Sequence, residues 1–381
     1  MKFFRTVSMM LSISITMMFM PVGKAEALSD EEITAPAAVL VDAGTGKVLY
    51  EKNAHEVRAC ASITKVMTLL LVMEAIDSGK LSLSDTVTTS AHASSMGGSD
   101  IWLEPGETMT VDEMVKATIV ASANDAAVAL AEHISGTEDE FVSEMNKKAK
   151  ELNMKETVFK NCNGLDEDGH VTSAYDVAVM SKELIKHKKI LEYSCIWMDE
   201  LRGGKTQLVN TNKLLKSYKG ITGLKTGTTS QAGSCISATA NRDGLELIAV
   251  VLGSASGKER FSDASKLLDY GFANYSMYQP KIPEEAICEI GVKNGMLSKV
   301  GTASEINDNI LVEKGSDKNI TSEIVLPTEL EAPVKKGDAI GKIIYKNGSK
   351  QIAEYLIAAR DDVKEINFSD VFGLMLRALT G

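Results

Sequence analysis

Residues 62–79 read SITKVMTLLLVMEAIDSG, the most informative stretch of this 381-residue chain. Its apolar side chains recur at three- and four-residue spacing, which is typical of a helix with one buried face. These positions are Val66, Leu69, Leu70, Met73 and Ile76. Ser78-Gly79 is a common helix end. We therefore expect a buried helix over residues 62–78, against which the neighbouring elements must pack.

The elements expected around this helix give the order of the fold. An apolar run, a Gly-containing turn and a second apolar run predict a β-hairpin over residues 37–51. Helical periodicity follows over 111–134, with a break near Ser122, and again over 138–152 and from 175 to about 187. Strands at 234–240 and 245–252, joined around Asp243-Gly244, predict another hairpin before a closing helix at 258–275. This order predicts an α+β domain over 34–277, with helices packed on an antiparallel sheet.

The pattern of residue types changes after this domain. Short β-branched runs alternate with Gly, Asn and Asp turns over 280–358, which predicts a small all-β domain. The expected strands are 286–290, 310–313, 320–326, 339–345 and 352–357.

A C-terminal amphipathic helix is expected over 360–381. Its apolar positions form one continuous stripe: Phe368, Val371, Phe372, Met375, Leu376 and Leu379. Such a helix suits the interface of a membrane surface, and packing on the β domain is the alternative. Basic residues are few there (Arg360, Lys364, Arg377), so attachment would depend on apolar burial.

The first 27 residues are expected to be a removable secretory signal. Lys2 and Arg5 precede an uncharged run, and Ala25-Glu26-Ala27 fits a signal peptidase site. A membrane-spanning anchor is the alternative, but the uncharged run is shorter than the ~20 residues that a span needs. The mature protein is therefore expected to be exported and to work at the extracytoplasmic face of the cell membrane.

Composition excludes several classes of protein. With 44% hydrophobic and 24% charged residues the chain is not disordered, and its net charge of −11 argues against nucleic acid as a partner. Five Cys are too few for a dense disulfide framework and include no CxxC pair. We expect isolated, mostly buried thiols, and neither a metal site nor a cofactor.

Three short motifs carry chemistry. In Ser62-Ile63-Thr64-Lys65, a lysine three residues after a serine can reach its hydroxyl and, once burial lowers its pKa, take the proton. Ser122 and Asn124 are polar residues within an apolar stretch, where a hydroxyl can relay a proton and an amide can hold a peptide group. A helix N-cap is the alternative for this second motif.

The third motif follows a Gly-punctuated strand. Lys225, Thr226 and Thr228 offer a cation and two hydroxyls that suit a carboxylate, and Gly227 lets a ligand backbone approach the strand. An exposed strand lysine beside a turn is the alternative.

Together the three motifs, in this chain order, resemble those of the penicillin-recognising serine transferases and β-lactamases. The resemblance is closer to the low-molecular-mass penicillin-binding proteins, which are serine-type D-alanyl-D-alanine carboxypeptidases, and closest to their sporulation-associated branch. It extends from about Thr34 to the C-terminus, over residues 38–50, 95–99, 103–107, 163–170 and 173–176 and then through the β domain and the terminal helix.

The resemblance implies removal of the terminal D-alanine from peptidoglycan stem pentapeptides through an acyl-enzyme, with β-lactam antibiotics as covalent inhibitors and no cofactor. Ser62 would be the nucleophile, Lys65 its base and Ser122 a proton relay. Asn124 would hold Lys65 and the substrate amide. The carboxylate would meet Lys225, Thr226 and Thr228, with backbone N–H groups of Ser62 and Thr228 as the oxyanion hole.

The sequence departs from the family pattern at two positions, and two alternative functions are compatible with the motifs. Cys60 stands two residues before the nucleophile and Cys162 where the family often has Pro, and we interpret both as packing residues. A serine β-lactamase on the same scaffold is one rival, although Ala149 stands where a deacylating Glu is expected before Glu151-Leu152-Asn153. A non-catalytic penicillin-binding wall scaffold is the other.

Overall fold

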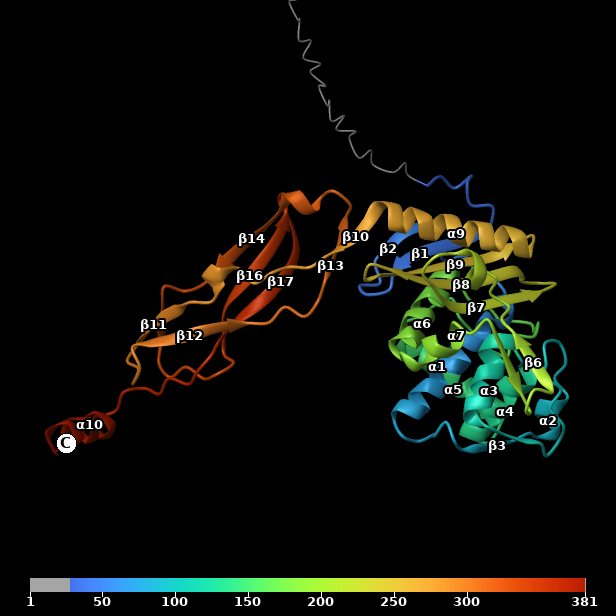
Figure 1. Ribbon diagram of the computed structural model, residues 1–381, viewed down its shortest axis with the longest axis horizontal. Helices are drawn as coiled ribbons and strands as arrows, with labels where there is room; N and C mark the ends of the chain where they lie inside the picture. Colours follow the sequence, from blue (N-terminus) through green and yellow to red (C-terminus); the bar gives the residue numbers. More distant parts are fainter. Residues whose placement is uncertain (1–27, 381) are drawn as a thin grey trace, which may run out of the picture.

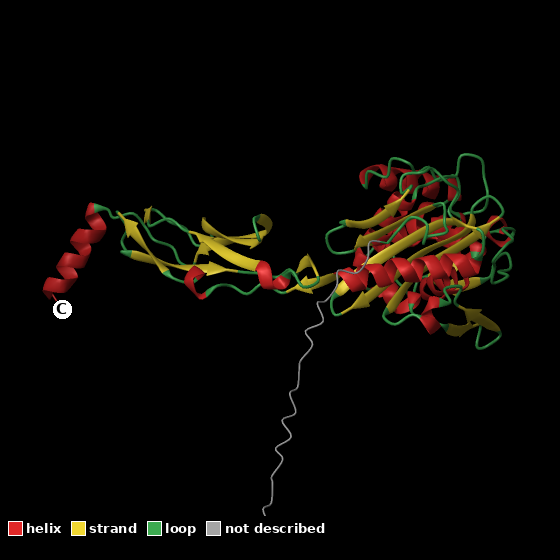
Figure 2. Cartoon of the chain, turned by 90° about the horizontal axis from the view of Figure 1, so that it is seen from above, coloured by secondary structure: helices red, strands yellow, loops and turns green. Residues whose placement is uncertain are grey.

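The computed structural model describes residues 28–380, so the expected signal segment at 1–27 lies outside the described residues. Figure 1 shows two lobes joined by a narrow connection, followed by one separate helix at the C-terminal end. The second view, in Figure 2, shows the same separation.

The first lobe is built on a five-stranded antiparallel sheet in the order β2-β1-β9-β8-β7. Strands β1 (Ala37–Asp42) and β2 (Val48–Lys52) form the expected first hairpin. The second expected hairpin is β8 (Gly233–Arg242) with β9 (Leu245–Ser254), and β7 (Ile221–Thr229) lies at the edge of the sheet. Asp243 and Gly244 both have positive φ, as the tight turn between β8 and β9 requires.

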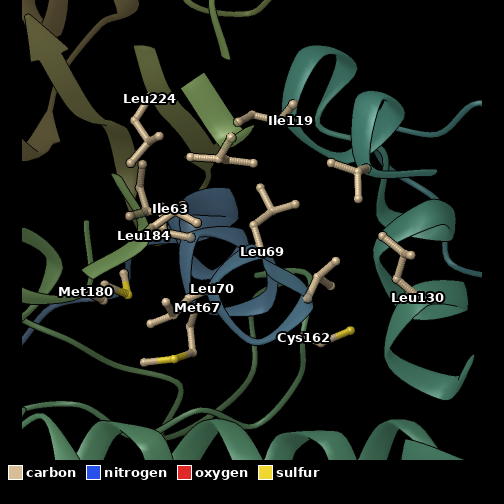
Figure 3. Packing of buried hydrophobic residues seen from close by; sticks show 14 of the residues in the cluster. Ile63, Met67, Leu69, Leu70, Ile119, Leu130, Cys162, Met180, Leu184 and Leu224 are labelled. Atoms are coloured by element: carbon tan, nitrogen blue, oxygen red, sulfur yellow. The ribbon is translucent and has the colours of Figure 1, made fainter. Parts of the chain in front are cut away.

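Helices cover both faces of this sheet, which explains why its central strands are apolar on both sides. Helix α9 (Gly257–Asn274) packs through Leu267 and Leu268 on one face. Helices α1 (Lys65–Asp77) and α6 (Ala174–Lys186) lie on the other face, and Figure 3 shows α1 surrounded by core side chains from several elements. The expected α+β architecture is therefore confirmed.

Shorter elements complete the lobe. Helices α3 (Val111–Lys116), α4 (Asn124–Ser135) and α5 (Glu138–Glu151) match the expected helical stretches, and a π-helical turn, η2 (Ala117–Ala121), precedes the break at Ser122. The remaining helices are α2 (Ala91–Ser94), α7 (Lys189–Ser194) and α8 (Leu214–Ser217). Two small antiparallel pairs are β3 (Thr86–Thr88) with β4 (Thr108–Thr110), and β5 (Met198–Leu201) with β6 (Thr206–Val209).

One expectation for this lobe is wrong in a way that matters for the site. Ser62 does not begin an α-helix, because residues Ala61–Thr64 form a 3-10 turn, η1, and α1 starts only at Lys65. Ala61 enters this turn with a φ of 51°, and the Thr64 hydroxyl donates to its carbonyl oxygen at 2.9 Å. A left-handed residue at this point prevents the α-helix from extending back through Ser62.

The second lobe is all β, as expected, but it contains more strands than the sequence predicted. Its six-stranded sheet has the order β14-β16-β17-β12-β11-β15. The strands are β11 (Glu289–Lys293), β12 (Lys299–Ser304), β14 (Ile320–Val325), β15 (Glu329–Glu331), β16 (Ala339–Asn347) and β17 (Lys350–Ala359). A separate ribbon pairs β10 (Tyr275–Tyr278) with β13 (Ile310–Glu313).

Sequence patterning missed β10, β12 and β15. Strands β12 and β15 are short or rich in small residues, so they carry little hydrophobic alternation. The strand expected at 286–290 begins later, because Glu284–Ala286 form a 3-10 turn, η3.

The terminal helix α10 (Phe368–Thr380) lies apart from the β sheet in both views (Figures 1 and 2). Five of its apolar side chains are about half exposed or more: Phe368, Phe372, Met375, Leu376 and Leu379. The alternative in which this stripe packs on the β domain is therefore not what the structure shows. In the part of the chain that is described, no helix is both long enough and apolar enough to cross a membrane.

Candidate active site

The η1 turn and the first residue of α1 bring a hydroxyl and an amine together. Lys65 Nζ lies 3.1 Å from Ser62 Oγ, and Lys65 is fully buried whereas Ser62 is half-buried. Burial disfavours the charged amine and lowers the pKa of Lys65 to about 7. The expected pairing of these two side chains is present in the structure, on a 3-10 turn.

Two further groups hold the Lys65 amine in place. It donates to Asn124 Oδ1 at 2.5 Å and to the backbone oxygen of Asn163 at 2.6 Å. The Asn124 amide in turn donates to the Gly97 carbonyl at 2.7 Å, so its oxygen is directed at Lys65. Asn163 acts through its main chain, which explains why no side-chain pattern pointed to it.

Ser122 faces the second lysine of the site. It adopts a left-handed conformation, with φ 63°, between η2 and α4, and its Oγ accepts a hydrogen bond of 2.8 Å from Lys225 Nζ. The residue at the N-cap of α4 is Ala123, without a side-chain cap. The helix-cap interpretation of Ser122 is therefore wrong.

The Lys-Thr-Gly motif lies on β7, the edge strand nearest η1. Lys225 is 1% exposed, which contradicts the alternative of an exposed strand lysine. Burial, together with the nearby cations Lys65 and Arg260, holds its pKa well below the usual range. Thr226 is also buried and donates to Thr211 Oγ1 at 2.6 Å, whereas Thr228 is exposed.

Glycines bring η1 close to its neighbours. A Cβ on Gly227 would lie 2.8 Å from the Ser62 nitrogen, so β7 and the nucleophile turn touch through their backbones. A Cβ on Gly164 would lie only 2.0 Å from the Ala61 oxygen. Any side chain at either position would displace the turn that carries Ser62.

Arg260 is a site residue that the sequence did not reveal. From α9, its Nη1 donates to the Gly227 oxygen and to Thr228 Oγ1, both at 2.8 Å. It is 9% exposed, and its buried Nε has no hydrogen-bond partner among residues 28–380. A single arginine in an amphipathic helix carries no local signal of this role.

The cysteines are structural in this arrangement. All five are free, and Cys60, Cys162 and Cys235 are buried. Burial raises the pKa of Cys60 to about 12, which keeps the thiol protonated and unreactive beside the nucleophile turn. Among residues 28–380, no group of His, Cys, Asp and Glu side chains could hold a metal ion.

The Ser-Lys pair, the facing Ser-x-Asn and the Lys-Thr-Gly edge strand define the class of penicillin-recognising serine enzymes. Residues 24–256 match the model of the peptidase S11 family, D-alanyl-D-alanine carboxypeptidase, and residues 276–365 match the C-terminal domain of penicillin-binding protein 5. The chain belongs to this D-alanyl-D-alanine carboxypeptidase family and is a serine-type D-alanyl-D-alanine carboxypeptidase.

Relatives of known sequence and structure agree with this assignment. The chain is 46% identical to D-alanyl-D-alanine carboxypeptidase DacF of Bacillus subtilis over 88% of its length and 87% of the relative's. Penicillin-binding protein 5 from Haemophilus influenzae superimposes with a TM-score of 0.76 at 32% identity, covering 89% of this chain and all of that one.

Penicillin-binding protein D2 from Listeria monocytogenes, solved with bound ampicillin, superimposes with a TM-score of 0.56 at 35% identity, covering 64% of this chain and all of that one. The family acts on peptidoglycan peptides that end in D-Ala-D-Ala and binds β-lactams. The carboxypeptidase assignment therefore takes precedence over the β-lactamase and scaffold alternatives, and Ala149 is a buried side chain on α5.

Proposed function

We propose that Ser62 attacks the carbonyl between the two terminal D-alanines while neutral Lys65 takes its proton. The observation that carries this proposal is the 3.1 Å contact between Lys65 Nζ and Ser62 Oγ, with burial lowering the lysine pKa to about 7. A base whose pKa lies near the working pH is the most effective proton acceptor.

Ser122 then gives its hydroxyl proton to the leaving amine of D-alanine and takes up the proton that Lys65 received from Ser62, so that Lys65 is neutral again. Lys225 orients the Ser122 hydroxyl by donating to it, and Asn124 holds Lys65 and the substrate amide. The backbone N–H groups of Ser62 and Thr228 stabilise the oxyanion, which the close contact of η1 with β7 supports. Water finally hydrolyses the acyl-enzyme, which releases the shortened peptide and restores Ser62.

The terminal carboxylate is received at Thr226, Gly227 and Thr228, with Arg260 beside them. The sequence alone assigned the positive charge to Lys225. Because the pKa of Lys225 is lowered, the unpaired Arg260 guanidinium is the better source of positive charge for the carboxylate.

Lys225→Ala should still reduce turnover, because Ser122 would lose its donor. Full activity of that variant would contradict its role.

Release of D-alanine from a pentapeptide, together with labelling by a fluorescent penicillin, tests this mechanism. The wild type should do both, and Ser62→Ala should do neither. Labelling without release would contradict the carboxypeptidase mechanism, and release by Ser62→Ala would contradict the assigned nucleophile.

We further propose that the mature protein is exported and that α10 attaches it to the outer face of the membrane. The exposed stripe of α10 supports this, since Phe368 and Leu379 are 83% and 81% exposed. Removal of residues 368–381 should move the protein from the membrane to the soluble fraction without loss of turnover. Unchanged membrane association would refute the anchor.

The resemblance to the sporulation-associated branch, with 46% identity to the Bacillus subtilis relative, extends the proposal to the wall made during spore formation. Comparing the amount of this protein in growing and sporulating cells of its source tests this. Equal amounts would argue against a dedicated role.

A further inference from the structure

The Glu138 carboxylate connects the surface of the first lobe to the segment that accepts from Lys65. Glu138 is the first residue of α5, and its side chain is 13% exposed. Its Oε1 accepts from the backbone nitrogen of Cys162 at 3.0 Å, and its Oε2 lies 2.7 Å from His92 Nε2. Because an ionised carboxylate only accepts hydrogen bonds, the imidazole is the donor. Both oxygens of this carboxylate therefore have a partner.

The segment that Glu138 contacts lies along α1. The Cys162 carbonyl accepts from Thr68 Oγ1 at 2.5 Å, and the next carbonyl, that of Asn163, accepts from Lys65 Nζ at 2.6 Å. Thr68 and Lys65 are three residues apart on α1, and Figure 3 shows Cys162 beside this helix. The orientation of the Asn163 carbonyl therefore depends on α5, through Glu138, as well as on α1.

This connection requires a residue with an N–H at position 162. Proline, which the family often has there, could not donate to Glu138. The thiol of Cys162 is not what makes the connection. It is buried, and burial together with the Glu138 carboxylate holds its pKa well above the usual range. The departure from the family pattern thus supplies a backbone donor beside the active site.

The Asn163 carbonyl decides where the Lys65 lone pair points. A neutral lysine amine has two N–H groups and one lone pair. The oxygens of Asn124 and Asn163 accept from the amine at 2.5 and 2.6 Å, and Ser62 Oγ lies in the third direction at 3.1 Å. With both carbonyl groups in place, the lone pair faces the Ser62 hydroxyl. The same two oxygens stabilise the charged form of the amine.

We propose that Glu138 is a positioning residue for Lys65. Through the Cys162 N–H it fixes the Asn163 carbonyl, which directs the Lys65 lone pair at the Ser62 hydroxyl. His92 holds the second oxygen of the carboxylate. Glu138 contacts no reacting atom itself, and the proposal rests on the proposed role of Lys65 as the base.

The test measures acylation by benzylpenicillin as a function of pH, with rates normalised to the fraction of protein that is finally labelled. Glu138→Ala should lower the second-order rate constant on the high-pH plateau about tenfold, because the lone pair is no longer aligned. The midpoint of the rise should move down by about one pH unit, since charged Lys65 loses an acceptor. Glu138→Gln keeps a carbonyl oxygen for the Cys162 N–H and should restore both values.

Two control variants separate this hydrogen bond from other effects. Glu140→Ala removes a negative charge from the same first turn of α5, where the side chain is exposed. Cys162→Ala removes the thiol and keeps the backbone donor. Neither should move the midpoint. An equal shift in Glu140→Ala would assign the effect to charge at the start of α5 and overturn the proposal.

Cys162→Pro removes the donor itself and allows a double-mutant cycle. In this background Glu138→Ala should change the plateau and the midpoint hardly further, because the connection is already broken. Losses that multiply would show that Glu138 acts by another route. If Cys162→Pro does not fold, the comparison of Glu138→Ala with Glu138→Gln and Glu140→Ala decides the question alone.

Failure of this proposal differs from failure of the proposed function. An unchanged plateau and midpoint in Glu138→Ala would overturn the positioning role. A lower plateau without a shift of the midpoint would also overturn it, because a merely structural change does not alter the acceptors of Lys65. A wild-type profile that is flat through pH 7 would instead contradict Lys65 as the base.

Discussion

At the scale of single residues, the main feature of the site is a pair of buried lysines that have no carboxylate partner among residues 28–380. Lys65 and Lys225 are both about 1% exposed or less, and a buried cation without a counter-ion is costly. Burial lowers the pKa of both amines, to about 7 for Lys65 and well below the usual range for Lys225, which reduces this cost. For Lys65 the same effect supplies the free lone pair that an attacking serine needs.

The pH dependence of acylation should therefore report Lys65. Because only the neutral amine accepts the Ser62 proton and its pKa is about 7, kcat/KM should rise as the pH increases through about 7 and then level off. Lys65→Arg should lose about 10²–10⁴-fold at all pH values, since a guanidinium remains protonated. A pH profile that is flat between pH 5 and pH 9 would contradict this assignment.

His170 stabilises the nucleophile turn η1 through a hydrogen bond to Thr64. Its Nδ1 accepts from the Lys160 backbone at 3.1 Å, which leaves Nε2 to donate to Thr64 Oγ1 at 2.7 Å. Thr64 donates in turn to the Ala61 oxygen within η1. Burial lowers the pKa of His170 to about 4, although the nearby Glu167 and Asp166 act in the opposite direction.

This pKa shift predicts a loss of stability in acid. As the pH falls from 6.5 to about 4, the unfolded chain takes up a proton at His170 before the folded protein does, so the free energy of unfolding decreases. The decrease should reach about 3 kcal/mol near pH 4 and then stop growing. His170→Gln can keep both hydrogen bonds but cannot titrate, so urea unfolding of this variant should show a smaller decrease. Identical pH dependence in the two proteins would contradict the assignment.

At the scale of elements, local motifs predicted the groups on η1, β7 and the η2–α4 junction because each motif is contiguous. The 3-10 geometry of η1 could not be predicted, since residues 62–78 have helical periodicity and the left-handed Ala61 depends on contacts with distant segments. Arg260 and the Asn163 carbonyl were missed for a related reason. One is an isolated residue on α9, and the other acts through a group that every residue possesses.

The contact between the Gly164 loop and η1 is a testable case. In Gly164→Ala, strain at positive φ costs ~1–2 kcal/mol, and overlap with the Ala61 oxygen at 2.0 Å must also displace η1. We expect a large loss of penicillin acylation rate together with a lower melting temperature. Gly169→Ala is a matched control, because φ is also positive there but the nearest atom is the flexible end of Lys160 at 3.4 Å. Similar acylation rates in the two variants would contradict a specific effect on η1.

At the scale of the whole molecule, the change of residue pattern near residue 280 predicted the order of the two lobes, and turns with Gly, Asn and Asp predicted most strand ends. The sheet order of the second lobe could not be predicted, because β11 pairs in parallel with β15 across three intervening strands in sequence. The pairing of β10 with β13 between the lobes could not be predicted either. These strands are separated by more than thirty residues in sequence and pair only in the folded chain.

The separation of the cores predicts two unfolding transitions. One lobe buries two clusters on either side of the sheet that contains β7, and the other buries two smaller clusters centred on residues such as Ile343 and Val300. Calorimetry should therefore resolve two heat-absorption peaks, the larger belonging to the first lobe because it buries more apolar surface. Excess benzylpenicillin, which should acylate Ser62, should raise only the larger peak, because a ligand stabilises the unit that binds it. A single transition that shifts as a whole would show instead that the β10–β13 ribbon couples the lobes into one cooperative unit.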